Sequence, residues 1–137
     1  MIDKIKEYVY SYYWNDDIYC ARTSLLTLCK LFDYDVSPQT VAAAIGLHGA
    51  GGYRAQCGLV EGPLMFIGIY YDYIGKSENE IAKICYDFAD KFHKKFSSLS
   101  CFDLRPNGFS EFDELHLCEN LTVEAINFAY EYLNVIY

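Results

Sequence analysis

The chain has 137 residues, of which 53% are hydrophobic, and a formal net charge of −8. This composition excludes disorder, and the length suits one domain, residues 1–137, that buries roughly two-thirds of its unfolded surface. The acidic balance and the scattered arginines argue against nucleic acid as a partner. No apolar run approaches the roughly 20 residues of a membrane span, and the charged stretch Met1–Glu7 does not resemble an export signal. We therefore expect a cytoplasmic protein with no membrane partner.

Helical periodicity accounts for most of the chain. Apolar residues recur every three to four positions, and capping residues or glycines separate these stretches. The predicted helices span residues 3–14, 17–32, 38–47, 55–71 and 77–96, followed by a last helix capped by Asn120 or Thr122. No stretch alternates convincingly as a strand. We predict an all-α fold, a compact bundle of about five to six helices.

Two regions break this regularity. The first is a glycine-rich loop, Gly49–Gly52, which precedes a helix in which Gly58 and Gly62 lie on one face, so that a neighbouring helix can approach closely. The second is residues 97–119, where turn residues replace any helical stripe. A connection this long within a small domain is usually functional or covers a site.

The six cysteines divide into two groups by pattern alone. In the cytoplasm, six cysteines indicate metal binding or redox chemistry more than a disulfide framework. Two of them lie within apolar helical stripes and are interpreted as small buried side chains: Cys29 and Cys85. The four that remain outside the predicted core stripes are Cys20, Cys57, Cys101 and Cys118.

Cys57 lies where a helix is predicted to begin. Unpaired backbone N–H groups and the positive end of the helix dipole favour a thiolate there, so we expect a lowered thiol pKa. Arg54 could lower it further, and Glu61, one turn later, could move protons for the thiol, although surface roles suit both residues equally well. His48 is expected only to satisfy helix carbonyls, and His93 to lie on a solvated face.

The stretch Cys57–Met65, with one cysteine before it and two after, resembles the C_GCAxxG_C_C family of redox-active proteins. The family pattern has an early cysteine, a Gly-Cys-Ala-x-x-Gly core and two later cysteines. Gln56 stands where the pattern has its first glycine, and Gly58 stands where it has alanine. The resemblance implies redox chemistry at the four cysteines, with Cys57 and Cys20 as candidate catalytic residues and a redox partner protein.

Several cofactors suit such a set of thiols. Four thiolates can hold an iron–sulfur cluster or zinc, and two can form a reversible disulfide that needs no cofactor. The cofactor- and metal-binding candidates are Cys20, Cys57, Cys101 and Cys118, whose spacings of 37, 44 and 17 residues favour no metal. His116, two residues before Cys118, slightly favours a zinc site, but redox chemistry is the preferred interpretation. The alternatives are a structural zinc or metal-carrying protein, and an interaction module with incidental thiols.

Overall fold

The computed structural model describes residues 1–105 and 117–136, and these residues form a helical bundle without any strand. The all-α prediction is therefore confirmed. Five helices have seven or more residues: α1 (Ile2–Tyr10), α2 (Cys20–Leu31), α5 (Gly58–Tyr73), α6 (Glu78–Phe96) and α8 (Glu119–Val135). The shorter elements are α3 (Pro38–Ala43), α4 (Gly49–Gly52), α7 (Cys101–Leu104) and a π-helical segment, η1 (Ser11–Asn15).

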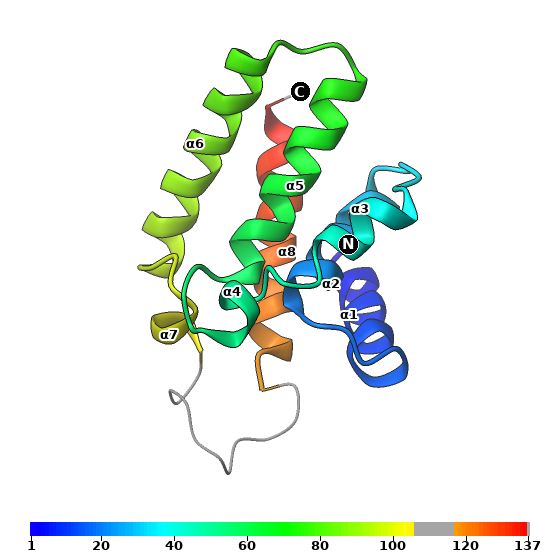
Figure 1. Cartoon of the computed structure of the whole chain (residues 1–137), viewed down its shortest axis with the longest axis vertical. Helices are drawn as coiled ribbons and strands as arrows, with labels where there is room; N and C mark the ends of the chain where they lie inside the picture. Colours follow the sequence, from blue (N-terminus) through cyan, green and yellow to red (C-terminus); the bar gives the residue numbers. More distant parts are fainter. Residues whose placement is uncertain (106–116, 137) are drawn as a thin grey trace.

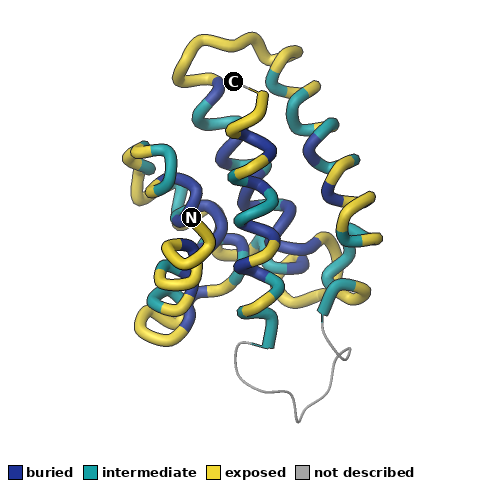
Figure 2. The backbone as a smooth tube through the Cα atoms, turned by 180° about the vertical axis from the view of Figure 1, so that it is seen from behind, coloured by how far each residue is buried: buried dark blue, intermediate teal, exposed yellow. Residues whose placement is uncertain are grey.

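Helices α5 and α8 run side by side through the middle of the molecule (Figure 1). Helix α6 packs on one side of α5, and α1 and α2 lie on the opposite side of this central pair. Buried residues concentrate where these helices face one another (Figure 2). The largest fully buried side chains include Leu25, Leu28, Phe66, Phe88, Phe92, Ile126 and Leu133. The core therefore joins all the longer helices.

The apolar residues that helical periodicity predicts to face the core are buried in the middle of each helix and partly exposed near its ends. In α6 only Phe88 and Phe92 are fully buried, whereas the flanking apolar residues are partly exposed. Ile136, predicted to face inward, is 40% exposed because α8 ends at Val135. Helix ends project beyond their neighbours, so a stripe at the end of a helix finds less to pack against.

Several predicted boundaries move for local reasons. The second helix begins at Cys20 instead of residue 17, because Asp17 adopts a left-handed φ of 52° that no helix can contain. The third ends at Ala43 and continues only as turns. The fourth begins at Gly58 instead of residue 55. Residues 97–119 contain the short α7, and the centre of that predicted loop, with His116, lies outside the described residues.

The predicted helix starts at residues 38 and 77 are confirmed to within one residue, and a serine caps each helix. The Thr40 N–H donates to Ser37 Oγ at 3.3 Å, and Pro38 occupies the first helical position of α3. In α6 the Glu80 N–H donates to Ser77 Oγ at 3.2 Å. Both serines satisfy a backbone donor that the helix leaves unpaired.

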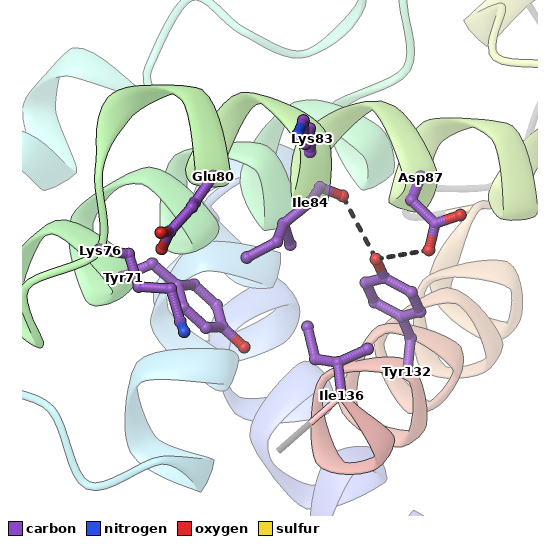
Figure 3. A pocket seen from close by; sticks show the side chains of 8 residues that line it. All are labelled: Tyr71, Lys76, Glu80, Lys83, Ile84, Asp87, Tyr132 and Ile136. Atoms are coloured by element: carbon purple, nitrogen blue, oxygen red, sulfur yellow. Dashed lines mark hydrogen bonds between the residues drawn. The ribbon is translucent and has the colours of Figure 1, made fainter.

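The end of the bundle where α5 passes into α6 is held partly by Tyr132 (Figure 3). Its hydroxyl donates to Asp87 Oδ2 at 2.9 Å and lies 3.3 Å from the Ile84 carbonyl oxygen. These bonds join α8 to α6 beside an open cavity of about 380 Å³ that Tyr71 and Ile136 also line.

Helices α2 and α5 approach closely where α5 has Gly62. A Cβ atom at this position would lie 2.6 Å from the Ala21 carbonyl oxygen and 2.7 Å from Ser24 Cβ. Both of these atoms belong to the relatively rigid part of α2. The two helices can therefore keep this distance only because the side chain is absent.

We expect Gly62→Ala to destabilise the protein by about 1–3 kcal/mol, because the added methyl group would force α2 and α5 apart. The matched control is Gly68→Ala in the same helix, where an added Cβ meets nothing within 4 Å. That change should stabilise by about 0.5–1 kcal/mol through helix propensity. Urea unfolding of both variants tests the difference, and equal effects would contradict it.

Candidate functional site

The four cysteines singled out from the sequence lie at the N-terminal ends of four different helices. Cys20 is the first residue of α2 and Cys101 the first of α7, whereas Cys57 and Cys118 are the N-cap residues of α5 and α8. The starts of α5 and α8, together with α4 and α7, lie at the same end of the bundle (Figure 1). Segments far apart in the sequence thus meet here.

The charges of these four thiols would act on one another's pKa. Burial raises the pKa of Cys20, and negative charge on Cys57, Cys118 or Cys101 would raise it further. Cys57 is coupled in the same way to Cys101 and Cys118. We call these four residues the cysteine cluster. The structure holds all of them as thiols.

Backbone pairing places Cys57 opposite Leu99 and Cys101 opposite Ala55, so the two cysteines are diagonal neighbours. The Cys57 N–H donates to the Leu99 carbonyl at 2.8 Å, and the Cys101 N–H donates to the Ala55 carbonyl at 2.7 Å. Between these bonds, Gln56 and Ser100 form an isolated antiparallel bridge. Because neighbouring residues of an extended chain point to opposite faces, the two cysteines after the bridged pair share one face.

Two glycines make room for two of the sulfur atoms. A Cβ atom at Gly58 would lie 2.5 Å from Cys20 Sγ and 2.8 Å from the Ala21 nitrogen. A Cβ at Gly49 would lie 3.3 Å from Cys101 Sγ, and Gly49 also has a φ of +65° that disfavours any side chain. The glycine-rich stretch therefore shapes the space around the cluster.

Cys57 does not have the lowered pKa expected of a thiol at a helix start. Burial raises its pKa to about 12, because only 5% of the residue is exposed and a thiolate there would lose its hydration. The Leu59 N–H, 3.4 Å from the sulfur, and the Val60 N–H lower the pKa but do not offset this burial. The expectation fails because the helix start is covered by other parts of the fold.

Cys101 has a different environment. It is only half-buried, and although burial raises its pKa, the positive charges of Arg105 and Arg54 lower it. The sequence analysis considered that Arg54 lowers the pKa of Cys57. In the structure the cysteine whose pKa it lowers is Cys101. The chain is extended through residues 55–57, and the Phe102 N–H donates to the Arg54 carbonyl at 3.3 Å, which holds Arg54 beside α7.

Several other candidates take structural roles. Glu61 accepts a hydrogen bond from the Gln56 side chain. His48 donates from Nδ1 to the Ile45 carbonyl oxygen at 2.9 Å and stacks on Tyr19, and His93 is exposed. Cys29 is buried and Cys85 half-buried against the core, as their positions in apolar stripes indicated.

The sequence predicted the four cysteines of the cluster as candidate metal ligands. Within residues 1–105 and 117–136, no three His, Cys, Asp or Glu side chains form a group that could hold a metal ion. The ligand set proposed from the sequence accordingly stays a prediction.

Sequence reasoning missed two hydroxyl groups beside the cluster, because aromatic residues at helical spacing usually only fill the core. Tyr13 is 3% exposed, and its hydroxyl lies 2.6 Å from Thr122 Oγ1. Burial raises its pKa, and charges on Cys20, Cys118 and Cys57 would raise it further. The available signal was general: a buried tyrosine hydroxyl needs a hydrogen-bond partner.

We expect Gly58→Ala, which introduces the alanine of the family pattern, to destabilise this protein by about 1–3 kcal/mol. The added methyl group would collide with Cys20 Sγ and with the α2 backbone. Urea unfolding measures the loss. An unchanged midpoint would show that α2 moves without cost and would contradict the expectation.

We also expect Arg54→Gln to raise the pKa of the Cys101 thiol, because one of the two positive charges that lower it is removed. Cys101 should then be alkylated more slowly at neutral pH, and the rate should recover as the pH rises. Mass spectrometry of iodoacetamide-treated protein reports the rate for each cysteine. Arg22→Gln, the third arginine, is the control and should leave the Cys101 rate unchanged.

The chain was compared with known protein families, curated proteins and solved structures. No curated protein and no solved structure matches the chain. Among the described residues, no helix is long and apolar enough to cross a membrane. The family model described as "Putative redox-active protein (C_GCAxxG_C_C)" matches residues 18–132, which include the whole cysteine cluster. The chain therefore belongs to the C_GCAxxG_C_C family of redox-active proteins.

Proposed function

We propose that this protein exchanges electrons in pairs with a disulfide-bearing partner, and that Cys101 and Cys57 are the reacting thiols. The observation that carries the proposal is the backbone pairing of residues 55–57 with residues 99–101, which places Cys57 and Cys101 on one face. Disulfide chemistry needs only two sulfur atoms, and joining diagonal neighbours of this kind requires a movement of the paired segments.

The exchange proceeds in two substitutions at sulfur. The Cys101 thiolate attacks one sulfur of the partner's disulfide, that S–S bond breaks, and the departing sulfur takes up a proton. The Cys57 sulfur, losing its own proton, then attacks Cys101 in the mixed disulfide and releases the second partner thiol. The partner gains two electrons and two protons, which Cys57 and Cys101 lose as their S–S bond forms.

The two thiols suit these roles for different reasons. Cys101 is half-buried and lies under the influence of two arginines, so it is the accessible thiol that ionises more readily. Cys57 is buried and its pKa is about 12, so it stays protonated and unreactive until a mixed disulfide forms beside it.

An iron–sulfur or zinc site is the other chemistry that four thiols allow. The described residues, however, contain no group of three ligand side chains arranged around a common point. The disulfide mechanism requires no such group and is therefore preferred.

The test begins with protein purified without oxygen, analysed for iron and zinc and by its visible absorbance. The metal-free protein is then titrated with oxidised and reduced glutathione, and its disulfides are located by peptide mass spectrometry. We expect a reversible two-electron couple with Cys57 joined to Cys101. Stoichiometric iron or zinc, or the absence of any reversible disulfide, would contradict the proposal.

Single variants test which cysteine attacks the partner's disulfide and which resolves the mixed disulfide. Cys101→Ser should abolish reaction with the external disulfide, whereas Cys57→Ser should trap the mixed disulfide on Cys101, because the resolving thiol is missing. Cys29→Ser and Cys85→Ser are matched controls, since both residues lie in apolar stripes away from the cluster. They should leave the couple unchanged.

A further inference from the structure

Helix α5 is apolar over most of its circumference, but the residues of one face are only half-buried. These residues are Leu64, Met65, Gly68 and Ile69. They line an open groove of about 520 Å³, to which α3 contributes Thr40 and α6 contributes Ile81. Figure 1 shows α5 between α3 and α6, with α8 behind it. A helix that is apolar nearly all round is usually buried all round, so this face indicates a surface that a further element covers.

Acidic side chains flank this face of α5 at both ends. Asp72 and Glu78 line the groove near the end of α5 and the start of α6, and both are exposed. Glu61 continues the same face toward the start of α5, because positions 61, 64, 68 and 72 follow one another at steps of three or four residues. Glu61 and Asp72 are 11 residues apart, which corresponds to about 16 Å along a helix.

These charges decide between two kinds of occupant. In an antiparallel pair of α5 helices from two copies of the chain, Asp72 of each copy would meet Glu61 of the other, and in a parallel pair identical acids would meet. Like charges that face one another weaken an interface, and the net charge of −8 adds to the repulsion. The groove therefore favours a partner with lysine or arginine over a second copy.

Gly68 favours a close approach of that partner. A Cβ atom added at Gly68 would meet nothing within 4 Å, so the backbone of α5 is open to the groove. Leu64 and Met65 lie one turn before this glycine, and Ile69 lies beside it. A partner helix presents side chains at the same three- to four-residue spacing and can lay an apolar face along such a groove.

We propose that this face of α5, between α3 and α6, is the docking surface for a basic amphipathic helix of a partner protein. The aliphatic face of that helix covers the apolar residues of the groove. Its lysine or arginine side chains, about three turns apart, pair with Glu61 at one end and with Asp72 and Glu78 at the other. This interaction goes beyond the proposed electron exchange, because none of its contacts involves a cysteine.

The test uses a designed peptide of about 18 residues, long enough to form a helix, with leucine along one face. Two lysines flank the leucines with the spacing of Glu61 and Asp72. A second peptide has glutamate in place of both lysines. Binding of each fluorescently labelled peptide to the full chain is measured by anisotropy. We expect the lysine peptide to bind about tenfold more tightly or better, with an affinity that falls as the salt concentration rises.

Two acids in the first turn of α6 provide matched variants. Glu78 lines the groove, whereas Glu80 lines the other cavity, beside Tyr71 and Ile136 (Figure 3). Glu78→Lys and Glu80→Lys therefore change the net charge equally but at different sites. We expect Glu78→Lys to weaken binding of the lysine peptide by about threefold to tenfold, because a weak exposed ion pair is replaced by a repulsion. Glu80→Lys should have a much smaller effect.

A third variant, Gly68→Leu, fills the groove itself. Because an added Cβ has open space at this position, we expect the variant to fold. Its side chain occupies the place of the partner helix, so affinity for the lysine peptide should fall about tenfold or more. Thermal unfolding checks the fold of each variant, and Glu78→Lys carries the test if Gly68→Leu does not fold.

Tighter binding of the lysine peptide that is weakened by Glu78→Lys and Gly68→Leu, but not by Glu80→Lys, would support the proposal. Absence of binding, equal binding of both peptides, or equal effects of the two lysine variants would overturn it. A dimer in sedimentation, or binding to vesicles of phosphatidylcholine and phosphatidylglycerol, would also overturn it if Gly68→Leu abolished either, because a second copy or a membrane would then occupy the groove. The peptides contain no cysteine, so this result is independent of the glutathione titration.

Discussion

The close contact of α2 with α5 is the constraint on which the rest of the structure depends. Gly58 and Gly62 lie one turn apart on α5 and leave space for Cys20 Sγ and for the α2 backbone. The same contact that packs the bundle therefore fixes one sulfur of the cluster against the start of α5. Core packing and site geometry are two consequences of one helix–helix distance.

Desolvation and local donors oppose one another throughout the cluster. Helix starts favour negative charge, but a buried thiolate loses its hydration, and at Cys57 the loss of hydration dominates. Cys101 escapes part of this penalty because it is half-buried and has arginines nearby. This gradient from an accessible thiol to buried ones is the physical basis of the proposed exchange, which would start at the surface and proceed inward.

The departures from the family pattern have direct structural explanations. Gln56 does not adopt a positive φ, so a glycine is not required by the backbone there, and its side chain binds Glu61. Gly58 occupies a position where this chain has no room for a methyl group, because Cys20 lies against it. Both substitutions thus fit the local backbone and packing of this chain.

Patterns within single stretches of sequence predict the all-α class, the five longer helices and the helix starts at residues 38 and 77, and they separate Cys29 and Cys85 from the other cysteines. Periodicity and capping are local properties, so single stretches of sequence carry them. Contacts between distant segments bury Cys57, bring Arg54 to Cys101 and join Tyr13 to Thr122. These facts depend on contacts between segments distant in the chain, and burial, which sets the pKa of a thiol, exists only once those segments have packed together.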